Sequence, residues 1–447
     1  MSTHIHRRQF LGRTAALGGC WIGAAATAGL AEEKSANAKL QHACIGAGGM
    51  QGMYDLGELA KSPNIEIVAI CDVDTRQSEG AAAQFPDARR YQDYREMLDR
   101  EADRIDSVNV TTPDHMHAPI SMLAMKNGKH VYCQKPLTHT VWEARQMAHL
   151  AARTGLTTCM GNQIHSQQEY RTATAVVHEG LIGKVREVHS WCPAPGDFWK
   201  QGVNARKPPH ADPVPAELDW ELWLGAAPAR PFTKGVYHPI VWRGWQDFGG
   251  GAIADMACHI FDPVFTSLKL TAPKSVTAQR AEMNSDTWPA WEIVSYVFPG
   301  TRYTAGDTVN VTWYDGGKQP AAEITQLPKS VKVPASASLF IGTEGRMLLP
   351  HVDMPQLFPT DRFADREMPL QEGVSHYTSW VATARQGKQV SDNFAYAGPL
   401  TEAVLLGTIA IRFPGQQLQW DTAQLKFTNN AEANGYLTKE YTSGFEA

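Results

Sequence analysis

The fold is decided by residues 131–140, which read VYCQKPLTHT. The stretch begins as a short apolar strand and then places Lys135 directly before Pro136. Because proline disfavours helix at the preceding residue, Lys135 is expected to end the strand in an extended conformation, and a helix is expected from Thr140. A lysine at the carboxyl end of a strand, ahead of a helix, lies where a doubly wound sheet holds its ligands. An ordinary surface lysine in a strand–helix turn is the competing interpretation, and the surrounding sequence has to decide between the two.

Residues 39–162 carry the alternating strand and helix pattern of a doubly wound parallel sheet. An apolar run ends at a glycine-rich loop, Gly46–Gly52, and a helix pattern follows. Glycines let the backbone approach a pyrophosphate, and the start of the helix offers free N–H groups and a positive dipole. The spacing departs from the usual GxGxxG, because Gln51 stands at the third glycine position and Gly52 follows it. The cofactor contacts expected from this loop are those of Gly46, Gly48, Gly49, Met50 and Gln51.

An acid, Asp72, directly follows the second apolar strand, about twenty residues beyond the glycine loop. A carboxylate at this position accepts hydrogen bonds from the adenosine ribose hydroxyls, which favours NAD over NADP. Arg76, one helical turn further on, leaves some room for a 2′-phosphate, and Asp72 could instead be the N-cap of the next helix. The combination of strand, glycine loop, helix and acid predicts a dinucleotide-binding domain of the Rossmann type.

The composition excludes several classes of protein. At 447 residues the chain is long enough for two domains, which we place at 39–162 and 163–447. Hydrophobic residues make up 43% and charged residues 19%, as in a soluble globular protein, and the net charge of −5 gives no general attraction to nucleic acid or anionic membranes. Seven cysteines are dispersed without a CxxC pair, so neither a zinc knuckle nor a dithiol redox centre is expected.

Residues 1–38 have the features of a targeting segment. Arg7 and Arg8 precede Phe10, and a run rich in alanine and glycine follows that is too short and too weakly apolar to predict a membrane span. This pattern resembles a twin-arginine (Tat) export signal, so we expect an exported, periplasmic protein whose mature form has no membrane span. An amphipathic N-terminal helix is the competing interpretation. Cys20 could pass for a lipoprotein cleavage site, but the apolar run continues beyond it, which argues against a lipid anchor.

The second half, residues 163–447, predicts an α+β domain. Segments between 275 and 345 alternate apolar and polar residues and carry turn glycines, which indicates a large open, mainly antiparallel sheet. A stretch rich in proline and tryptophan, about 193–248, lacks a regular pattern, and loops of this length are usually functional. We therefore expect a lid or rim over a ligand site, although aromatic packing explains any single tryptophan equally well. The residues of this half expected to contact a substrate are Gln163, His165, Trp242 and Arg243.

Asp255 and His259 lie four residues apart in an apolar helix pattern that begins after three glycines, Gly249–Gly251. This spacing places both side chains on one face of the helix. Polar groups on an apolar helix need partners when they are buried. The pair is therefore either a satisfied couple in the core or part of a ligand site, and these two residues alone do not decide between the two.

Together these motifs resemble the Gfo/Idh/MocA family of NAD(P)-dependent sugar and polyol oxidoreductases, in particular its exported members. The resemblance rests on the glycine loop, Asp72, the segment 112–117 (TPDHMH), the triplet Gln134-Lys135-Pro136, and Asp255 with His259. It implies a Rossmann domain followed by an α+β domain, whose open sheet often pairs between subunits, so we expect a homo-oligomer. Tightly bound NAD is the expected cofactor, a carbohydrate is the expected small-molecule substrate, and no resident metal is expected.

The resemblance also implies roles for residues beside the cofactor. Thr112, Pro113 and His117 would contact the nicotinamide. Lys135 would lie between the nicotinamide and the reacting hydroxyl. The family's triplet is usually Glu-Lys-Pro, so the neutral amide of Gln134 here replaces an acid at the cofactor. The charge near Lys135 is therefore expected to differ from that of a typical member.

The implied reaction is hydride transfer between NAD and a carbinol or ketone of a sugar, glycoside or polyol. His259, aided by Lys135, would move the hydroxyl proton, while Asp255 would orient His259 or bind a substrate hydroxyl. Because free NAD is scarce outside the cytoplasm, an exported enzyme would retain its cofactor. Retention suits the oxidation of one sugar coupled to the reduction of a second one.

Three other functions stay open. One is redox-neutral glycoside cleavage through transient oxidation at C3, which the resemblance includes through glycoside hydrolase family 109. Another is a non-catalytic sugar or cofactor sensor, which the lysine–histidine set disfavours. The third is metal-dependent hydrolysis, which would leave the glycine loop and Asp72 without a purpose. Its candidate ligands are His115, His117, His165, Asp255 and His259.

Overall fold

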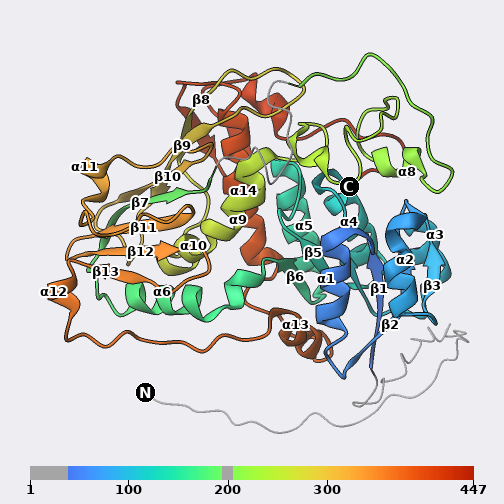
Figure 1. Ribbon diagram of the computed structural model, residues 1–447, viewed down its shortest axis with the longest axis horizontal. Helices are drawn as coiled ribbons and strands as arrows, with labels where there is room; N and C mark the ends of the chain where they lie inside the picture. Colours follow the sequence, from blue (N-terminus) through green and yellow to red (C-terminus); the bar gives the residue numbers. More distant parts are fainter. Residues whose placement is uncertain (1–38, 194–204) are drawn as a thin grey trace, which may run out of the picture. The chain divides into compact units, whose positions relative to one another are not determined.

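The computed structural model describes residues 39–193 and 205–447, which Figure 1 shows in colour. The expected export signal, residues 1–38, lies outside the described residues. Residues 39–447 form one unit that contains two sheets. Within the described ranges, no helix combines the length and the apolar character that a membrane crossing requires.

The first sheet has six parallel strands in the order β3-β2-β1-β4-β5-β6, which confirms the expected Rossmann architecture. Strands β4 and β6 are continuous runs of buried residues, as expected where helices cover both faces. The strands are β1 (Leu40–Ile45), β2 (Ile65–Cys71), β3 (Arg89–Tyr91), β4 (Ser107–Val110), β5 (His130–Gln134) and β6 (Thr158–Gly161). The helices are α1 (Gly49–Leu59), α2 (Thr75–Gln84), α3 (Tyr94–Arg100), α4 (His117–Lys126) and α5 (Val141–Thr154).

The stretch that decides the fold is stabilised by a capping box at the start of α5. β5 ends at Gln134, and the Thr140 hydroxyl accepts a hydrogen bond from the N–H of Glu143 (3.3 Å). The Glu143 carboxylate in turn accepts one from the N–H of Thr140 (2.9 Å). This exchange satisfies backbone donors that a helix start otherwise leaves unpaired. Lys135 is therefore held in a short turn between a buried strand and a well-capped helix.

The second sheet has nine strands in the order β13-β12-β11-β7-β10-β9-β8-β14-β15, and β7 with β10 is its parallel pair among antiparallel neighbours. The expected large, mainly antiparallel sheet is thus confirmed. Its strands are β7 (Val185–Trp191), β8 (Ser275–Arg280), β9 (Glu292–Pro299), β10 (Thr308–Tyr314), β11 (Ala337–Gly342), β12 (Arg346–Pro350), β13 (Gln356–Phe358), β14 (Leu418–Asp421) and β15 (Lys426–Phe427). The helices of this half are α6 (Gln168–His178), α9 (Gly251–Ile260), α10 (Asp262–Leu268), α11 (Ala322–Thr325), α12 (Thr360–Phe363), α13 (His376–Ala384) and α14 (Phe394–Ala410).

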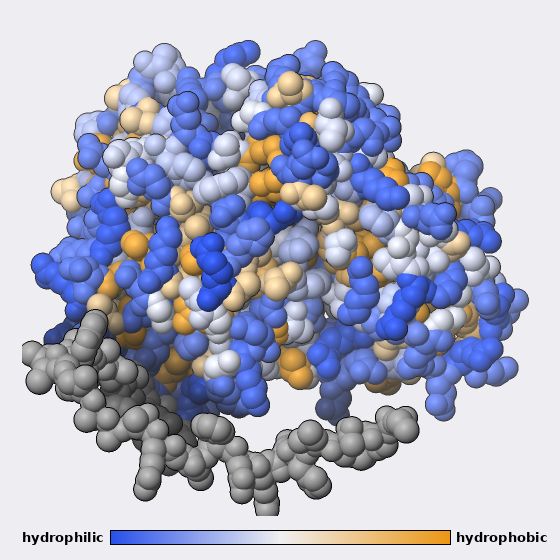
Figure 2. Space-filling model, turned by 180° about the vertical axis from the view of Figure 1, so that it is seen from behind, coloured by the Kyte–Doolittle hydropathy of each residue, from blue (hydrophilic) through white to orange (hydrophobic). Residues whose placement is uncertain are grey.

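One face of the second sheet packs on helices, and the other is partly covered by the chain itself. Buried side chains of α9, α10 and α14 share a core with β9 and β10. On the opposite face, Leu327 and Val331 pack against a cluster that includes Trp191 and Leu339, and the Trp191 indole N–H donates to the carbonyl of Pro334 (2.8 Å). The pairing of subunits through this sheet, and with it the oligomeric state, stays a prediction. Figure 2 shows one face of the molecule, on which hydrophobic residues are dispersed among hydrophilic ones.

The proline- and tryptophan-rich stretch is more ordered than its sequence indicates. Residues 205–248 contain a short helix, α8 (Trp220–Leu224), and a cluster of buried aromatic side chains. Trp220 and Trp223 stack with ring centroids 4.7 Å apart, and Trp245 is buried in the same cluster. The expectation of a stretch without regular structure was therefore wrong for this part, because the aromatic residues build a small core of their own.

Candidate active site

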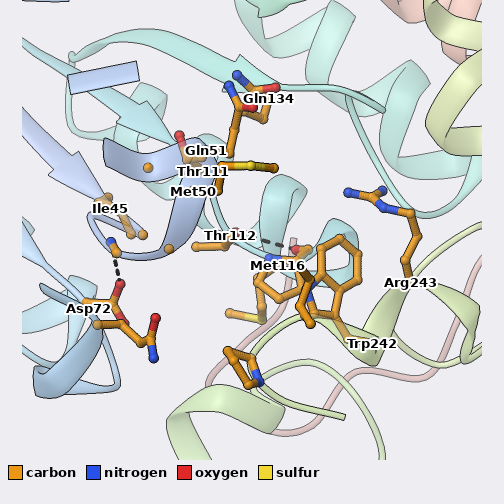
Figure 3. A pocket seen from close by; sticks show the side chains of 18 of the residues that line it. Ile45, Met50, Gln51, Asp72, Thr111, Thr112, Met116, Gln134, Trp242 and Arg243 are labelled. Atoms are coloured by element: carbon orange, nitrogen blue, oxygen red, sulfur yellow. Dashed lines mark hydrogen bonds between the residues drawn. The ribbon is translucent and has the colours of Figure 1, made fainter. Parts of the chain in front are cut away.

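A cavity of about 560 Å³ lies at the carboxyl ends of the parallel strands, where α/β folds bind ligands (Figure 3). The ends of β1, β2, β4 and β5 form one side of it, and α9 with the 205–248 segment forms the other. Most of the expected site residues line this cavity: Gly46, Gly48, Gly49, Met50, Gln51, Asp72, Thr112, Pro113, Gln134, Lys135, Gln163, Trp242, Arg243, Asp255 and His259. Arg76, His117 and His165 lie outside its wall.

The glycine loop has room for a pyrophosphate in spite of its displaced spacing. Gly46 has a φ of +82°, and a Cβ on it would lie 2.3 Å from the carbonyl oxygen of Thr111. A Cβ on Gly52 would lie 2.3 Å from the carbonyl oxygen of Gly46, so Gly52 provides the close helix–strand packing of the usual third glycine. The N-cap of α1 is Gly48, which has no side chain to occupy the first N–H groups of the helix. These groups therefore suit an anion.

Asp72 is placed for a ribose contact and not for helix capping. Its carboxylate accepts hydrogen bonds from the N–H of Gly48 (2.9 Å) and the N–H of Asp74 (3.0 Å). The N-cap of α2 is Asp74, whose side chain accepts from the N–H of Arg76, so the capping alternative for Asp72 was wrong. Burial, with a contribution from the charge of Asp74, raises the pKa of Asp72 to about 6.

Arg76 forms an ion pair with Asp74. Its guanidinium donates to both carboxylate oxygens of Asp74, at 2.8 and 2.7 Å. His238 of the 205–248 segment lies 2.8 Å from the same carboxylate. Burial alone would raise the pKa of Asp74, but Arg76 and His238 hold it below its ordinary value. Arg76 was considered as a partner for the 2′-phosphate of NADP, but its guanidinium is already engaged in this ion pair with Asp74.

The opposite end of the cavity collects charges from both halves of the chain. Lys135 forms an ion pair with the carboxylate of Asp255 on α9 and also lies 3.2 Å from the Asp255 carbonyl oxygen. Arg243 lies 3.3 Å from Asp255 and 3.1 Å from the buried Asp114, and its guanidinium stands over the ring of Trp242 at 4.2 Å. Two cations and two carboxylates thus meet where a substrate would enter, and they compensate one another.

His259 is oriented by an amide, and its second ring nitrogen has no hydrogen-bond partner among residues 39–193 and 205–447. Its Nδ1 is hydrogen-bonded to Asn162 Oδ1, while Asn162 Nδ2 donates to the carbonyl of Cys258 (3.0 Å). Since Asn162 offers an acceptor, His259 Nδ1 carries the proton and Nε2 carries the lone pair. Burial, then the charge of Lys135 and the nearby His351, lowers the pKa of His259 well below its usual value. The imidazole is therefore neutral and can accept a proton.

Asn162, and not the expected Asp255, is the hydrogen-bonding partner of the His259 ring. Asp255 was expected to orient this histidine or to bind substrate, but its carboxylate pairs with Lys135 and Arg243, and Asn162 holds the ring of His259. The i, i+4 spacing correctly placed both residues toward the cavity. It could not reveal that Asn162, at the end of β6, lies closer to the histidine.

His117 and His165, two of the expected contacts, lie outside the cavity wall. The buried His117 bridges two loops, with Nδ1 2.7 Å from the Pro136 carbonyl and Nε2 2.8 Å from the Thr112 carbonyl. His165 lies 2.8 Å from Asp262 and 2.9 Å from Ser391. Burial would lower the pKa of His165, but the charge of Asp262 raises it to about 9. His117 thus ties the nicotinamide-side loop to the turn after Lys135.

Four further residues of the site were not predicted from the sequence. His351 lines the cavity with its ring 6.0 Å from that of His259, and burial lowers its pKa to about 4. Asn162 and Asp114 fix His259 and Arg243, and Asp55 binds the amide of Gln134. Asp114 belongs to the TPDHMH segment and Asn162 adjoins Gln163, so both had a local signal. Asp55 and His351 had none, because each reaches the site only through packing.

The side chains that the sequence offered as metal ligands form other interactions. His115 Nε2 lies 3.2 and 3.1 Å from the carbonyls of Trp223 and Leu224. Among the described residues, the group that brings three metal-ligating side chains together is the buried set Cys159, His376 and Asp392, which the sequence did not suggest.

A cavity with phosphate and ribose contacts at one end and titratable groups at the other is that of a dinucleotide-dependent oxidoreductase. Two family models agree with this class. Residues 40–162 match the NAD-binding Rossmann fold of the Gfo/Idh/MocA oxidoreductase family, and residues 167–313 match the C-terminal alpha/beta domain of the same family. The chain belongs to this family, as the resemblance of its motifs predicted.

Individual relatives are similar to parts of the chain. An inositol 2-dehydrogenase from Rubrobacter xylanophilus is 32% identical over 111 residues, which cover 25% of this chain and 31% of the relative. An alpha-N-acetylgalactosaminidase from Shewanella oneidensis is 29% identical over 146 residues, which cover 31% of each chain. The chain thus matches about a third of the length of these curated relatives. The WlbA dehydrogenase from Bordetella pertussis, solved with NADH and UDP-GlcNAcA, shares the fold with a TM-score of 0.59 at 15% identity, over 86% of this chain and 99% of that one.

Proposed function

We propose that this protein transfers a hydride between NAD and a carbinol or ketone carbon of a sugar, glycoside or polyol. The observation that carries the proposal is the meeting of Lys135 and the neutral His259 at the end of the cavity opposite Asp72. The glycine loop, Asp72 and the family membership account for the cofactor. The named substrates of the relatives, inositol and amino sugars, belong to the same class of polyhydroxylated compounds.

The residues of the chain divide the proton chemistry between them. When bound, NAD supplies the hydride acceptor at the carbon that is oxidised. His259 Nε2, with its free lone pair, takes the proton of the substrate hydroxyl. Lys135 donates a hydrogen bond to the same oxygen, and Asp255 holds the ammonium group in place. Trp242 and Arg243 provide an aromatic surface and a cation beside it, a combination that suits a sugar ring with polar substituents.

A direct experiment uses the purified, full-length protein. We expect nucleotide released by denaturation to have the mass of NAD or NADH. Sugars and polyols added to the intact protein should change the absorbance of the reduced nicotinamide band. Bound nucleotide without a response to any member of a broad polyol panel would instead favour a cofactor sensor, and the absence of nucleotide with no binding of added NAD would contradict the proposal.

We further propose that the cofactor is retained, because the 205–248 segment closes over the adenosine end. Leu218 forms a β-bridge with Asp74, and the N–H of Asp219 donates to the carbonyl of Val73 (2.9 Å). Leu222, Trp223 and His238 from this segment line the cavity that Asp72 borders. A cofactor beneath this cover leaves slowly, so reactions that return it to its starting state are favoured.

Redox-neutral glycoside cleavage is therefore the second candidate function. The cover over the adenosine end and the partial similarity to an alpha-N-acetylgalactosaminidase both favour it. The test is the release of aglycone from nitrophenyl glycosides without net accumulation of NADH. Net NADH formation on free sugars without aglycone release would select the dehydrogenase instead.

Export and self-association complete the proposal. Arg7 and Arg8 support export by the twin-arginine route, with folding and cofactor loading before export. Replacement of both by lysine should keep a reporter-tagged protein in the cytoplasm. The open part of the second sheet supports a homo-oligomer, which light scattering on the purified protein would measure.

A further inference from the structure

Asp55 is a buried carboxylate just behind the wall of the cavity, on helix α1. Four donors from different elements bind it. They are Gln51 Nε2 (2.8 Å), the Thr111 hydroxyl (2.7 Å), the Tyr377 hydroxyl (2.6 Å) and Gln134 Nε2, which lies 3.0 and 2.9 Å from the two carboxylate oxygens. Within the described part of the chain, all of these partners are neutral.

The directions of these hydrogen bonds fit an ionised carboxylate. The Thr111 oxygen accepts a hydrogen bond from Asn109 Nδ2 (2.9 Å), so its own hydrogen is left for Asp55. The Tyr377 oxygen accepts from Gln163 Nε2 (2.7 Å) and likewise donates to Asp55. A protonated carboxyl group would need an acceptor, which this set of donors does not offer. Burial raises the pKa of Asp55, and the four donors oppose that rise.

Asp55 also decides which end of each glutamine amide remains for the cavity. Gln51 and Gln134 both use Nε2 to bind Asp55, and Gln163 uses Nε2 to bind Tyr377. All three glutamines line the cavity, and Figure 3 shows Gln51 and Gln134 near Thr111, on the side away from Asp72. The carbonyl oxygen of each amide is therefore not used by Asp55, and that of Gln134 accepts a long hydrogen bond from the N–H of Lys135 (3.4 Å). The wall beside Lys135 offers acceptors instead of donors.

The other charges at this end already compensate one another. Lys135 pairs with Asp255, and Arg243 bridges Asp255 and Asp114. Asp55 is the carboxylate here whose partners are all uncharged. The nicotinamide ring carries a positive charge when oxidised and none when reduced. A buried negative charge beside the ring therefore stabilises the oxidised form selectively, because a low-dielectric interior screens it weakly.

We propose that Asp55 is a positioning residue that biases the bound cofactor toward its oxidised form. It supplies the negative charge that the neutral Gln134 cannot carry, and it turns the carbonyl oxygens of Gln51 and Gln134 away from itself and toward the cofactor side. The inference rests on NAD binding, which the family establishes, and not on the identity of the sugar. Gln134 and Asp55 form a matched pair, because an acid at both positions would bring two buried carboxylates into contact.

The test moves the negative charge from position 55 to position 134 in the NAD-bound protein. The variants are Asp55→Asn, Gln134→Glu and the double variant, and the readout is the midpoint potential of the bound NAD, titrated spectroscopically without substrate. We expect Asp55→Asn to lower the ratio of NAD⁺ to NADH affinity about tenfold, which raises the potential by about 30 mV for a two-electron couple. The double variant carries one carboxylate again, at position 134, and should return to within about threefold of the parent ratio.

The matched control is Glu101→Gln, which removes the charge of another buried acid, one that pairs with Arg89 and lies outside the cavity wall. It should leave the potential unchanged. A folded Asp55→Asn protein with the parent potential overturns the inference, and so does a shift of equal size in the control. If Asp55→Asn does not fold, the double variant decides, since a folded double variant with a tenfold altered ratio also overturns it. Failure of the parent protein to bind NAD would appear separately, as missing nucleotide in every variant.

Discussion

The two ends of the cavity hold their functional groups by different means. At the adenosine end, backbone N–H groups of Gly48 and Asp74 fix the Asp72 carboxylate, and all three residues belong to the Rossmann half. At the reacting end, Lys135 and Asp255 are fixed by each other across the two halves of the chain. A group bound to backbone amides keeps its place when a distant side chain changes. A group held by an ion pair between separate elements loses its place when its partner is replaced, because its own charge is then uncompensated.

This difference predicts that substitutions at the reacting end stop the chemistry without releasing the cofactor. We expect His259→Ala and Lys135→Ala each to lower kcat by about 10²- to 10⁴-fold, the usual contribution of a positioned acid or base. The dissociation constant for NAD should change by less than about threefold, because the glycine loop and Asp72 are untouched. Steady-state kinetics and isothermal titration with NAD would measure the two quantities.

A matched histidine variant controls for this first prediction. His149 is an exposed histidine on α5, outside the cavity wall, and His149→Ala should retain full activity. Loss of NAD binding in parallel with kcat would show that the two ends of the cavity are not independent. Full turnover in both Lys135→Ala and His259→Ala would remove them from the mechanism.

The second prediction concerns cofactor retention at the adenosine end. Asp74→Asn weakens the links to His238 and Arg76 at the point where the 205–248 segment meets β2. We expect the release rate of NAD to rise about tenfold, equivalent to about 1.4 kcal/mol, while kcat at saturating cofactor stays within about twofold. Stopped-flow exchange against a fluorescent NAD analogue would measure the rate. Glu79→Gln, an exposed change on the same helix α2, should leave the release rate unchanged.

A third, smaller effect separates the two ends by pH. Asp72 has a pKa of about 6, and its ionised form accepts hydrogen bonds from the ribose hydroxyls. Affinity for NAD is therefore complete above this pKa and falls as the carboxylate is protonated below it. We expect about a three- to fivefold loss between pH 7 and pH 5.5. Titrations at both pH values would measure it, and Asp72→Asn should bind more weakly but with the same affinity at both. Equal pH dependence in parent and variant would assign the effect to another group.

The adenosine end and the fold were open to prediction because their signals are local. The glycine loop, Asp72 and the strand before Lys135 each form within a few residues. The alternation of strand and helix then determines a parallel sheet with few possible arrangements. Even the displaced glycine follows from close packing, since Gly52 touches the backbone of Gly46.

The reacting end was predicted only in part, because its pairings depend on packing between distant segments. The sequence identified Lys135, Asp255 and His259 as site residues, but it did not identify the residues that they contact. His351 lies in the loop after β12, and its ring lies near that of His259 in the cavity. Asn162, which directly follows β6, binds His259 in place of Asp255 because the end of this strand lies beside α9. A pattern within one helix cannot contain this information.

The smallest expected effect is at Arg76, and it tests whether the adenosine end is as complete within itself as its hydrogen bonds indicate. The Arg76 guanidinium already donates two hydrogen bonds to Asp74, so it would have to leave this ion pair to bind a 2′-phosphate. We therefore expect Arg76→Gln to change the ratio of NAD to NADP affinity by less than about twofold. Competitive titration of both nucleotides would measure the ratio. A selective loss of NADP binding of fivefold or more would show that Arg76 exchanges Asp74 for the phosphate, and that the adenosine end rearranges on binding.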